Sequence, residues 1–127
     1  MGKKAEVRDR EAIEARVIAM ANEIEGLFGL GWIDIKHHFS TAKPDEQAST
    51  CETDAIWKYR YAKLTWNYDC VAATTDQQLR EIIVHEFVHV LMGPIKEHMK
   101  TADYVVELEE FATESIARVL LALMGDV

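Results

Sequence analysis

The chain has 127 residues, of which 49% are apolar and 28% are charged, with only 6 glycines and 2 prolines. This length predicts a single domain over residues 1–127 with its own apolar core, and the composition excludes collagen-like, low-complexity and disordered proteins. The formal net charge is −8. A phosphate backbone requires a basic face, so nucleic acid is not an expected partner.

The sequence contains no pattern for export or membrane insertion. Charged residues from Glu6 to Arg10 follow the basic start, so no apolar signal region is present, and Glu6 stands where a myristoylation motif requires Ser or Thr. No apolar run reaches the roughly 18 residues of a membrane span. The two cysteines, Cys51 and Cys70, are expected to be free thiols, with a bridge between them as the alternative. We therefore expect a cytoplasmic protein without a membrane partner.

The first half of the chain predicts one helix followed by a small sheet. Apolar residues recur at steps of three and four from Glu6 to Leu30, which indicates an amphipathic helix. The β-prone run Trp32–Phe39 predicts a strand, and the polar stretch Thr41–Asp54 predicts a long exposed loop. Residues 55–69 predict two adjacent strands that break around Ala62 and Lys63, giving a sheet of about three strands.

The second half predicts two helices. Thr75 and Gln78 form a capping-box pattern at the start of the first one, and Gly93 and Pro94 predict its end after Met92. The second helix spans residues 102–124. Its apolar side consists of Val105, Leu108, Ala112, Ile116, Val119, Leu120 and Leu123. The order helix, small sheet, helix, helix defines an α+β fold.

The first of these helices contains the H-E-x-x-H pattern as His85-Glu86-Phe87-Val88-His89. Residues four apart lie one turn above each other on a helix, so both imidazoles can bind one zinc ion. Glu86 then lies beside the open coordination position and can accept a proton from water. Apolar residues surround the pattern, so paired ligands are a better interpretation than two solvated histidines.

A catalytic zinc usually has three protein ligands, so the third must come from elsewhere in the chain. Met92 and Ile95 occupy the positions at which the metzincin pattern requires Gly and His, which excludes that class. The last predicted helix offers four carboxylates: Glu107, Glu109, Glu110 and Glu114. The periodicity of the apolar residues slightly favours Glu109 as the third ligand, and Glu110 is the other candidate. Glu107 and Glu114 also fit a solvated helix face.

At His85, Glu86 and His89, with the glutamates downstream, the sequence resembles the gluzincin clan of zinc peptidases. It is most similar to the short gluzincin-like proteins of bacteriophages and prophages. In that clan the glutamate ligand is often followed, four positions later, by a residue that supports a ligand histidine. Glu110 and Glu114 fit this spacing. The resemblance therefore implies one zinc per chain held by His85, His89 and Glu110, with Glu109 as the alternative third ligand, in a zincin-like domain.

The same resemblance implies a zinc-dependent metallopeptidase, with Glu86 as the general base and a peptide or protein as the substrate. In the clan an edge strand takes up the peptide in extended form, and we expect residues Lys63–Tyr68 to supply that edge. A phage-encoded protein would act in the host cytoplasm. The alternative is a zincin-like accessory protein that binds zinc and a protein partner with little or no catalysis. The sequence selects no particular substrate and no oligomeric state.

Other histidines and aromatic residues are weaker candidates. His37 and His38 follow each other on a predicted strand, so one should face the core and the other solvent. His98 is expected at the surface, with a role as proton donor as the alternative. Tyr104 or a tyrosine of residues 55–69 could polarise a substrate carbonyl, but no motif selects one.

Overall fold

The computed structural model describes residues 7–41, 50–98 and 103–125. In chain order the elements are α1 (Val7–Phe28), β1 (Asp34–Ser40), β2 (Cys51–Ile56), the 3-10 helix η1 (Trp57–Tyr59), β3 (Tyr61–Asn67), α2 (Tyr68–Ala72), α3 (Asp76–His98) and α4 (Asp103–Leu123). The predicted α+β class and the three-stranded sheet are confirmed.

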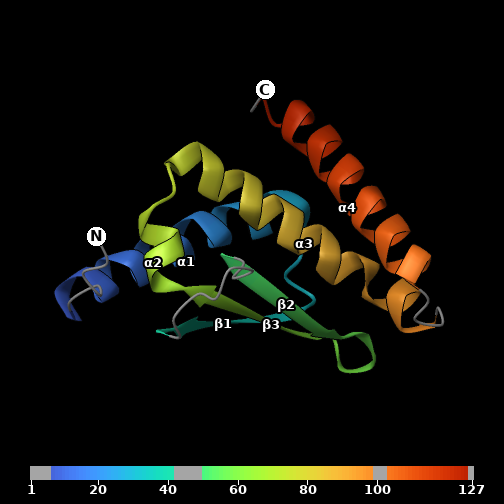
Figure 1. The fold of residues 1–127 in the computed structure, drawn as a ribbon, viewed down its shortest axis with the longest axis horizontal. Coiled ribbons are helices and arrows are strands. Elements are labelled where there is room, and N and C mark those ends of the chain that lie inside the picture. The colour runs from blue at the N-terminus through green and yellow to red at the C-terminus, as the bar shows by residue number, and fades with distance from the viewer. Residues whose placement is uncertain (1–6, 42–49, 99–102, 126–127) are drawn as a thin grey trace.

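The sheet is mixed, and β3 is its central strand. β1 pairs with β3 in parallel, whereas β2 pairs with it antiparallel, from Cys51 opposite Trp66 to Ile56 opposite Tyr61. Within the described residues no strand pairs with the other side of β2. One face of the sheet is covered by α1 and α3, and α4 leans against α3 (Figure 1). This arrangement leaves β2 as the edge strand beside α3.

The apolar core lies between the sheet and the two long helices. Every second residue of β3 faces the helices and is fully buried: Ala62, Leu64 and Trp66. α1 contributes Val17, Ala21 and Ile24, and α3 contributes Leu79, Ile83, Val84, Phe87 and Val88. Burial of each large side chain contributes roughly 1.5–3 kcal/mol. The helix that carries the H-E-x-x-H pattern is thus fixed on the sheet by its apolar side.

The start of α3 was predicted correctly, and its end was not. The capping box is present, because Gln78 N donates to Thr75 Oγ1 at 3.1 Å and Thr75 N donates to Gln78 Oε1 at 2.9 Å. The predicted end after Met92 is wrong, since α3 continues through Gly93 to His98. At Gly93 an added Cβ would lie 3.5 Å from the Ala55 Cβ, so the helix packs closely on β2 there. This packing outweighs the local helix-stop signal.

The predicted strand boundaries also need correction. Ala62 and Lys63 lie inside β3, and the chain turns instead at η1 and Arg60, whose φ of 51° is left-handed. The predicted loop Thr41–Asp54 is wrong at its end, because Cys51–Asp54 belong to β2. This strand is polar on its outer face, which resembles a loop in the sequence. The short helix α2 was not predicted, and Asn67 caps it by accepting a bond from Cys70 N at 3.0 Å.

α4 turns a different face inward from the one predicted. Its buried row is Glu109, Thr113, Ala117 and Leu121, whereas Leu108, Ile116, Val119 and Leu123 are exposed. The two polar residues of the buried row face inward because Glu109 bonds to His89 and to Thr113. The side chain of Val105 lies outside the described residues. An apolar surface therefore remains on the outside of this helix.

Both cysteines are free, with Cys51 buried and Cys70 half-buried, as expected. Over the described ranges, none of the helices combines the length and apolar character needed to cross a bilayer.

Candidate metal centre

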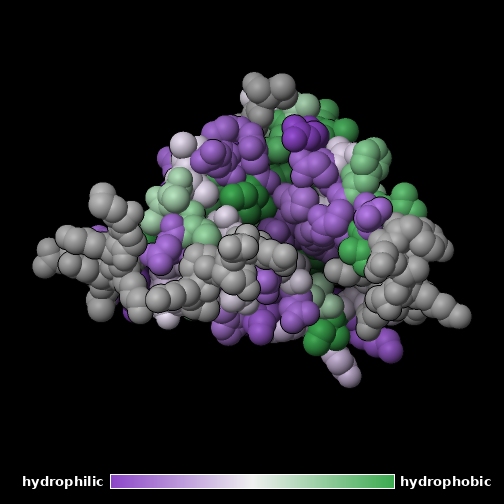
Figure 2. Space-filling model, viewed as in Figure 1, coloured by the Kyte–Doolittle hydropathy of each residue, from purple (hydrophilic) through white to green (hydrophobic). Residues whose placement is uncertain are grey.

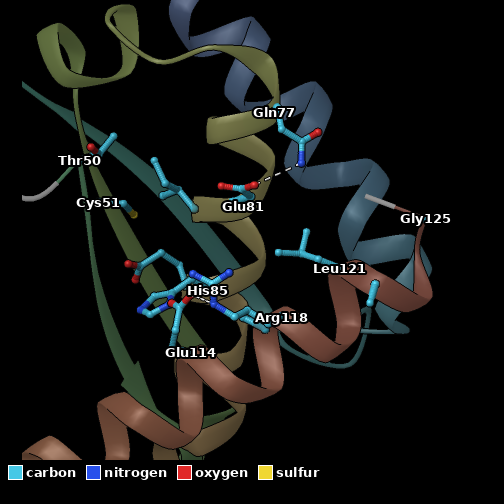
Figure 3. A pocket seen from close by; sticks show the side chains of 13 residues that line it. Thr50, Cys51, Gln77, Glu81, His85, Glu114, Arg118, Leu121 and Gly125 are labelled. Carbon is cyan, nitrogen blue, oxygen red and sulfur yellow. Dashed lines mark hydrogen bonds and ion pairs between the residues drawn. The ribbon is translucent and has the colours of Figure 1, made fainter. Parts of the chain in front are cut away.

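His85 and His89 lie one turn apart on the side of α3 that faces α4, and their Nε2 atoms are 3.1 Å apart. Both side chains are only partly exposed. The apolar side of α3 is held against the sheet, and both imidazoles line the space between α3, α4 and β2. Figure 3 shows His85 on the side of α3 that faces α4. The H-E-x-x-H pattern therefore has the helical geometry that the sequence predicts.

Glu110 reaches the same point from α4. Its Oε1 lies 3.2 Å from His89 Nε2, and its Oε2 lies 3.7 Å from His85 Nε2. The potential ligand atoms of the three residues all lie within 4.8 Å of one another. With metal bonds of about 2.0–2.1 Å, the ligand atoms of a tetrahedral zinc site lie roughly 3.3 Å apart. The spacing of these three side chains therefore fits a zinc ion.

Each histidine has a carboxylate on its other ring nitrogen. Glu114 Oε2 lies 2.7 Å from His85 Nδ1, and Glu109 Oε1 lies 2.8 Å from His89 Nδ1. An ionised carboxylate only accepts hydrogen bonds, so both Nδ1 atoms must donate. An imidazole whose Nδ1 carries the proton has its lone pair on Nε2, which is the atom directed at Glu110. These outer carboxylates select the tautomer that a metal requires.

Two side chains of α4 contact the outer carboxylates and fix their positions. Thr113 Oγ1 donates to Glu109 Oε1 at 3.3 Å, and Arg118 Nε lies 3.0 Å from Glu114 Oε1. Glu109 is buried, and its Oε2 has no hydrogen-bond partner among the described residues. It lies behind His89 rather than between the two imidazoles. Of the two candidates for the third ligand, Glu110 has the geometry of a ligand and Glu109 that of a supporting group.

Glu86 is buried beside the histidines and is bonded to the edge strand. Thr53 Oγ1 of β2 donates a hydrogen bond to Glu86 Oε2. Burial raises the pKa of Glu86, because the charged form loses its hydration. Thr53 was not identified in the sequence, since its role depends on the packing of β2 along α3. No local pattern could have revealed it.

Two neighbouring cavities are lined by residues of this centre. One of about 800 Å³ lies between α3, α4 and the start of β2, and the other, of about 630 Å³, follows β2 toward Glu110. Both are lined by Cys51, His85 and Glu86. Figure 3 shows His85, Glu114 and Arg118 beside the larger cavity. The histidines thus lie in a groove that runs along the edge strand.

The segment expected to bind a peptide as an edge strand, Lys63–Tyr68, does not form an edge of the sheet. Residues Lys63–Asn67 belong to β3, which is paired on both sides, and Tyr68 begins α2. The edge beside the histidines is β2, and Thr53 and Ala55 line the groove. The polar outer face of β2 led to its prediction as a loop. Because this strand was missed, the edge strand of the sheet was assigned to the wrong segment.

The other candidates lie away from the centre or outside the described residues. His37 accepts a bond from Trp66 Nε1 at 3.0 Å, whereas His38 is exposed, as the strand alternation predicts. Burial lowers the pKa of His37. The side chains of His98 and Tyr104 are not among those described. The aromatic residues of the segment 55–69 line neither cavity of the groove.

No protein-family model and no curated protein matches this chain. The side-chain arrangement and the sequence resemblance are therefore the observations that bear on function.

Proposed function

We propose that the chain is a zincin-like, zinc-dependent hydrolase of peptide bonds. The observation that carries this proposal is the convergence of His85 Nε2, His89 Nε2 and the Glu110 carboxylate in an open groove, with the Glu86 carboxylate beside them. A cytoplasmic location and a phage or prophage context belong to the same proposal, through the resemblance to small gluzincin-like proteins.

The donor set supports zinc as the cofactor. Two imidazoles and one carboxylate suit zinc better than magnesium or calcium, which prefer oxygen ligands. His85, His89 and Glu110 would hold the ion, and three protein ligands leave one coordination position for water or substrate. When bound, zinc acts as a Lewis acid that lowers the pKa of water and polarises a carbonyl group.

Glu86 would act as the general base. Its carboxylate accepts a proton from the water that attacks the carbonyl carbon, and it then passes that proton to the amine as the C–N bond breaks. Thr53 fixes Oε2 of this carboxylate, so Oε1 is the oxygen that remains for the water.

The free side of β2 would position the substrate. An extended peptide can pair with the unpaired backbone groups of an edge strand, which aligns it along that strand. β2 borders the cavity that contains Glu86, His89 and Glu110. A peptide on this edge would pass the candidate metal centre with room on both sides of it.

Peptide hydrolysis by the zinc-loaded protein tests the proposal. We expect cleavage of unstructured peptides, measured by mass spectrometry, and its loss in Glu86→Gln, which keeps the metal ligands. Glu81→Gln is the matched control, because Glu81 lies on the same helix and lines the larger cavity. Failure of the zinc-loaded wild type to cleave any peptide, or equal cleavage by Glu86→Gln, would overturn the proposal and favour the accessory protein.

A further inference from the structure

The outer face of α4 is apolar although no described residue covers it. The exposed fractions are 57% for Leu108, 73% for Phe111, 41% for Ile116, 59% for Val119 and 79% for Leu123. In Figure 2 apolar side chains follow the outer edge of the molecule over α4, and hydrophilic ones fill the side toward α3. This face lies opposite the buried row that begins at Glu109.

The area of this face is at the upper end of the roughly 300–600 Å² that the largest apolar patch of a typical monomer covers. The five side chains expose on the order of 600 Å² of apolar surface, at roughly 200 Å² for each fully exposed large side chain. A patch of this size is often functional in a soluble protein. It also approaches the ~800 Å² per partner of a stable protein interface.

The centre line of the face has a symmetric spacing. Leu108, Phe111, Ser115, Val119 and Ala122 follow one another at steps of 3, 4, 4 and 3 residues, so the row reads the same in both directions from Ser115. A two-fold axis requires the same surface patch on both copies to be self-complementary. An antiparallel pair of α4 helices centred on Ser115 meets this requirement.

The side chains along the row are also complementary in size. In such a pair Phe111 of one copy meets Val119 of the other, and Leu108 meets Ala122, so that a large residue packs against a smaller one. Ser115 of one copy meets Ser115 of the other where the two helices cross. A small residue at this point lets the helices approach closely. Its Oγ donates to Phe111 O at 2.8 Å, so burial would not strand its hydroxyl group.

We propose that α4 forms an antiparallel contact with α4 of a second copy of this chain, with the two-fold axis at Ser115. The contact covers the face of α4 that points away from His85 and His89. It is independent of the proposed hydrolysis, because a dimer can form whether or not the chain holds zinc or cleaves peptides.

The molar mass of the full chain in solution tests the contact. At about 100 μM protein, a dimer with a dissociation constant of roughly 10 μM or tighter is the main species. Light scattering should give twice the chain mass for the wild type and the chain mass for Phe111→Glu and Val119→Glu. Leu27→Glu is the matched control, since Leu27 is 60% exposed on α1, and it should remain dimeric.

A cross-linking experiment tests the register. Ser115→Cys, in a chain that also carries Cys70→Ser, should be linked into dimers by a short bismaleimide, whereas Ala12→Cys in the same background should not. Circular dichroism of each variant checks that it is folded. A monomeric wild type, a dimer that persists in both glutamate variants, or a dimer without a link at position 115 would overturn the proposal.

Discussion

Glu109 and Glu110 are adjacent in the sequence and contact opposite nitrogens of one imidazole. Glu109 Oε1 lies 2.8 Å from His89 Nδ1, and Glu110 Oε1 lies 3.2 Å from His89 Nε2. Consecutive helix residues point about 100° apart, so α4 directs one carboxylate behind the ring and the other in front of it. The two candidates for the third ligand therefore have different places at the same histidine.

Replacing Glu109 should weaken zinc binding without removing it. Glu109→Ala leaves the Nδ1–H of His89 without its acceptor, and loss of such a partner lowers metal affinity about 10- to 100-fold. Glu109→Gln keeps an oxygen acceptor and should have a smaller effect. Zinc affinity is measured by competition with a chelating dye. Glu107→Ala, a change at an exposed position of α4, is the control. Complete loss of zinc in both Glu109 variants, with zinc retained in Glu110→Ala, would make Glu109 the ligand.

Thr53 should support the base in hydrolysis. Thr53→Val keeps the shape of the side chain but removes the hydrogen bond to Glu86, and a bond to a charged group contributes about 1.5–3 kcal/mol. We expect kcat to fall roughly 10- to 100-fold with a smaller change in KM. Thr53→Ser restores the hydroxyl group and should recover most of the activity. A rise in KM alone would show that Thr53 acts on peptide binding instead.

The core under the histidine helix should be sensitive to truncation. Phe87 is fully buried and packs edge-on against Phe28, with ring centroids 6.4 Å apart. Phe87→Ala should lower the free energy of unfolding by about 3–5 kcal/mol, as measured by urea denaturation. Leu27→Ala, at an exposed position of α1, should change it by less than about 0.5 kcal/mol. Equal effects of the two changes would contradict the packing described.

His37 should make the fold less stable in acid. Burial, and secondarily His38, lower its pKa in the folded chain, so the unfolded chain binds a proton first as the pH falls. Its contribution is present above the unfolded pKa of about 6.5 and is lost as the pH falls from there through the lower folded pKa. Denaturation measured at pH 7, 6 and 5 gives the free energy of unfolding at each pH. This free energy should fall less between pH 7 and pH 5 in His37→Gln than in His38→Gln. A larger loss in His37→Gln would contradict the assignment.

The features that the sequence predicted correctly depend on near neighbours in the chain. The capping box of Thr75 and Gln78 and the alternation of His37 and His38 each follow from a few consecutive residues. So does the one-turn spacing of His85 and His89 on a helix. In each case the local pattern alone specifies the geometry.

The features that it missed depend on contacts between distant segments. β2 is a strand because Cys51–Ile56 pair with β3, although the segment is polar on its outer face. α4 buries Glu109 and Thr113 because His89, on another helix, supplies a hydrogen-bond donor. A hydropathy pattern places such residues outside, so the inward face of α4 and the role of Thr53 could only follow from the assembled fold.

Metal content tests the candidate zinc centre most directly. The protein is purified without chelator, incubated with zinc and desalted, and its zinc is measured by elemental analysis beside His85→Ala, Glu110→Ala and Glu107→Ala. We predict about one zinc per chain in the wild type and in Glu107→Ala, and loss of zinc in the other two variants. A wild type that takes up no zinc, or one whose zinc survives both His85→Ala and Glu110→Ala, would contradict the account.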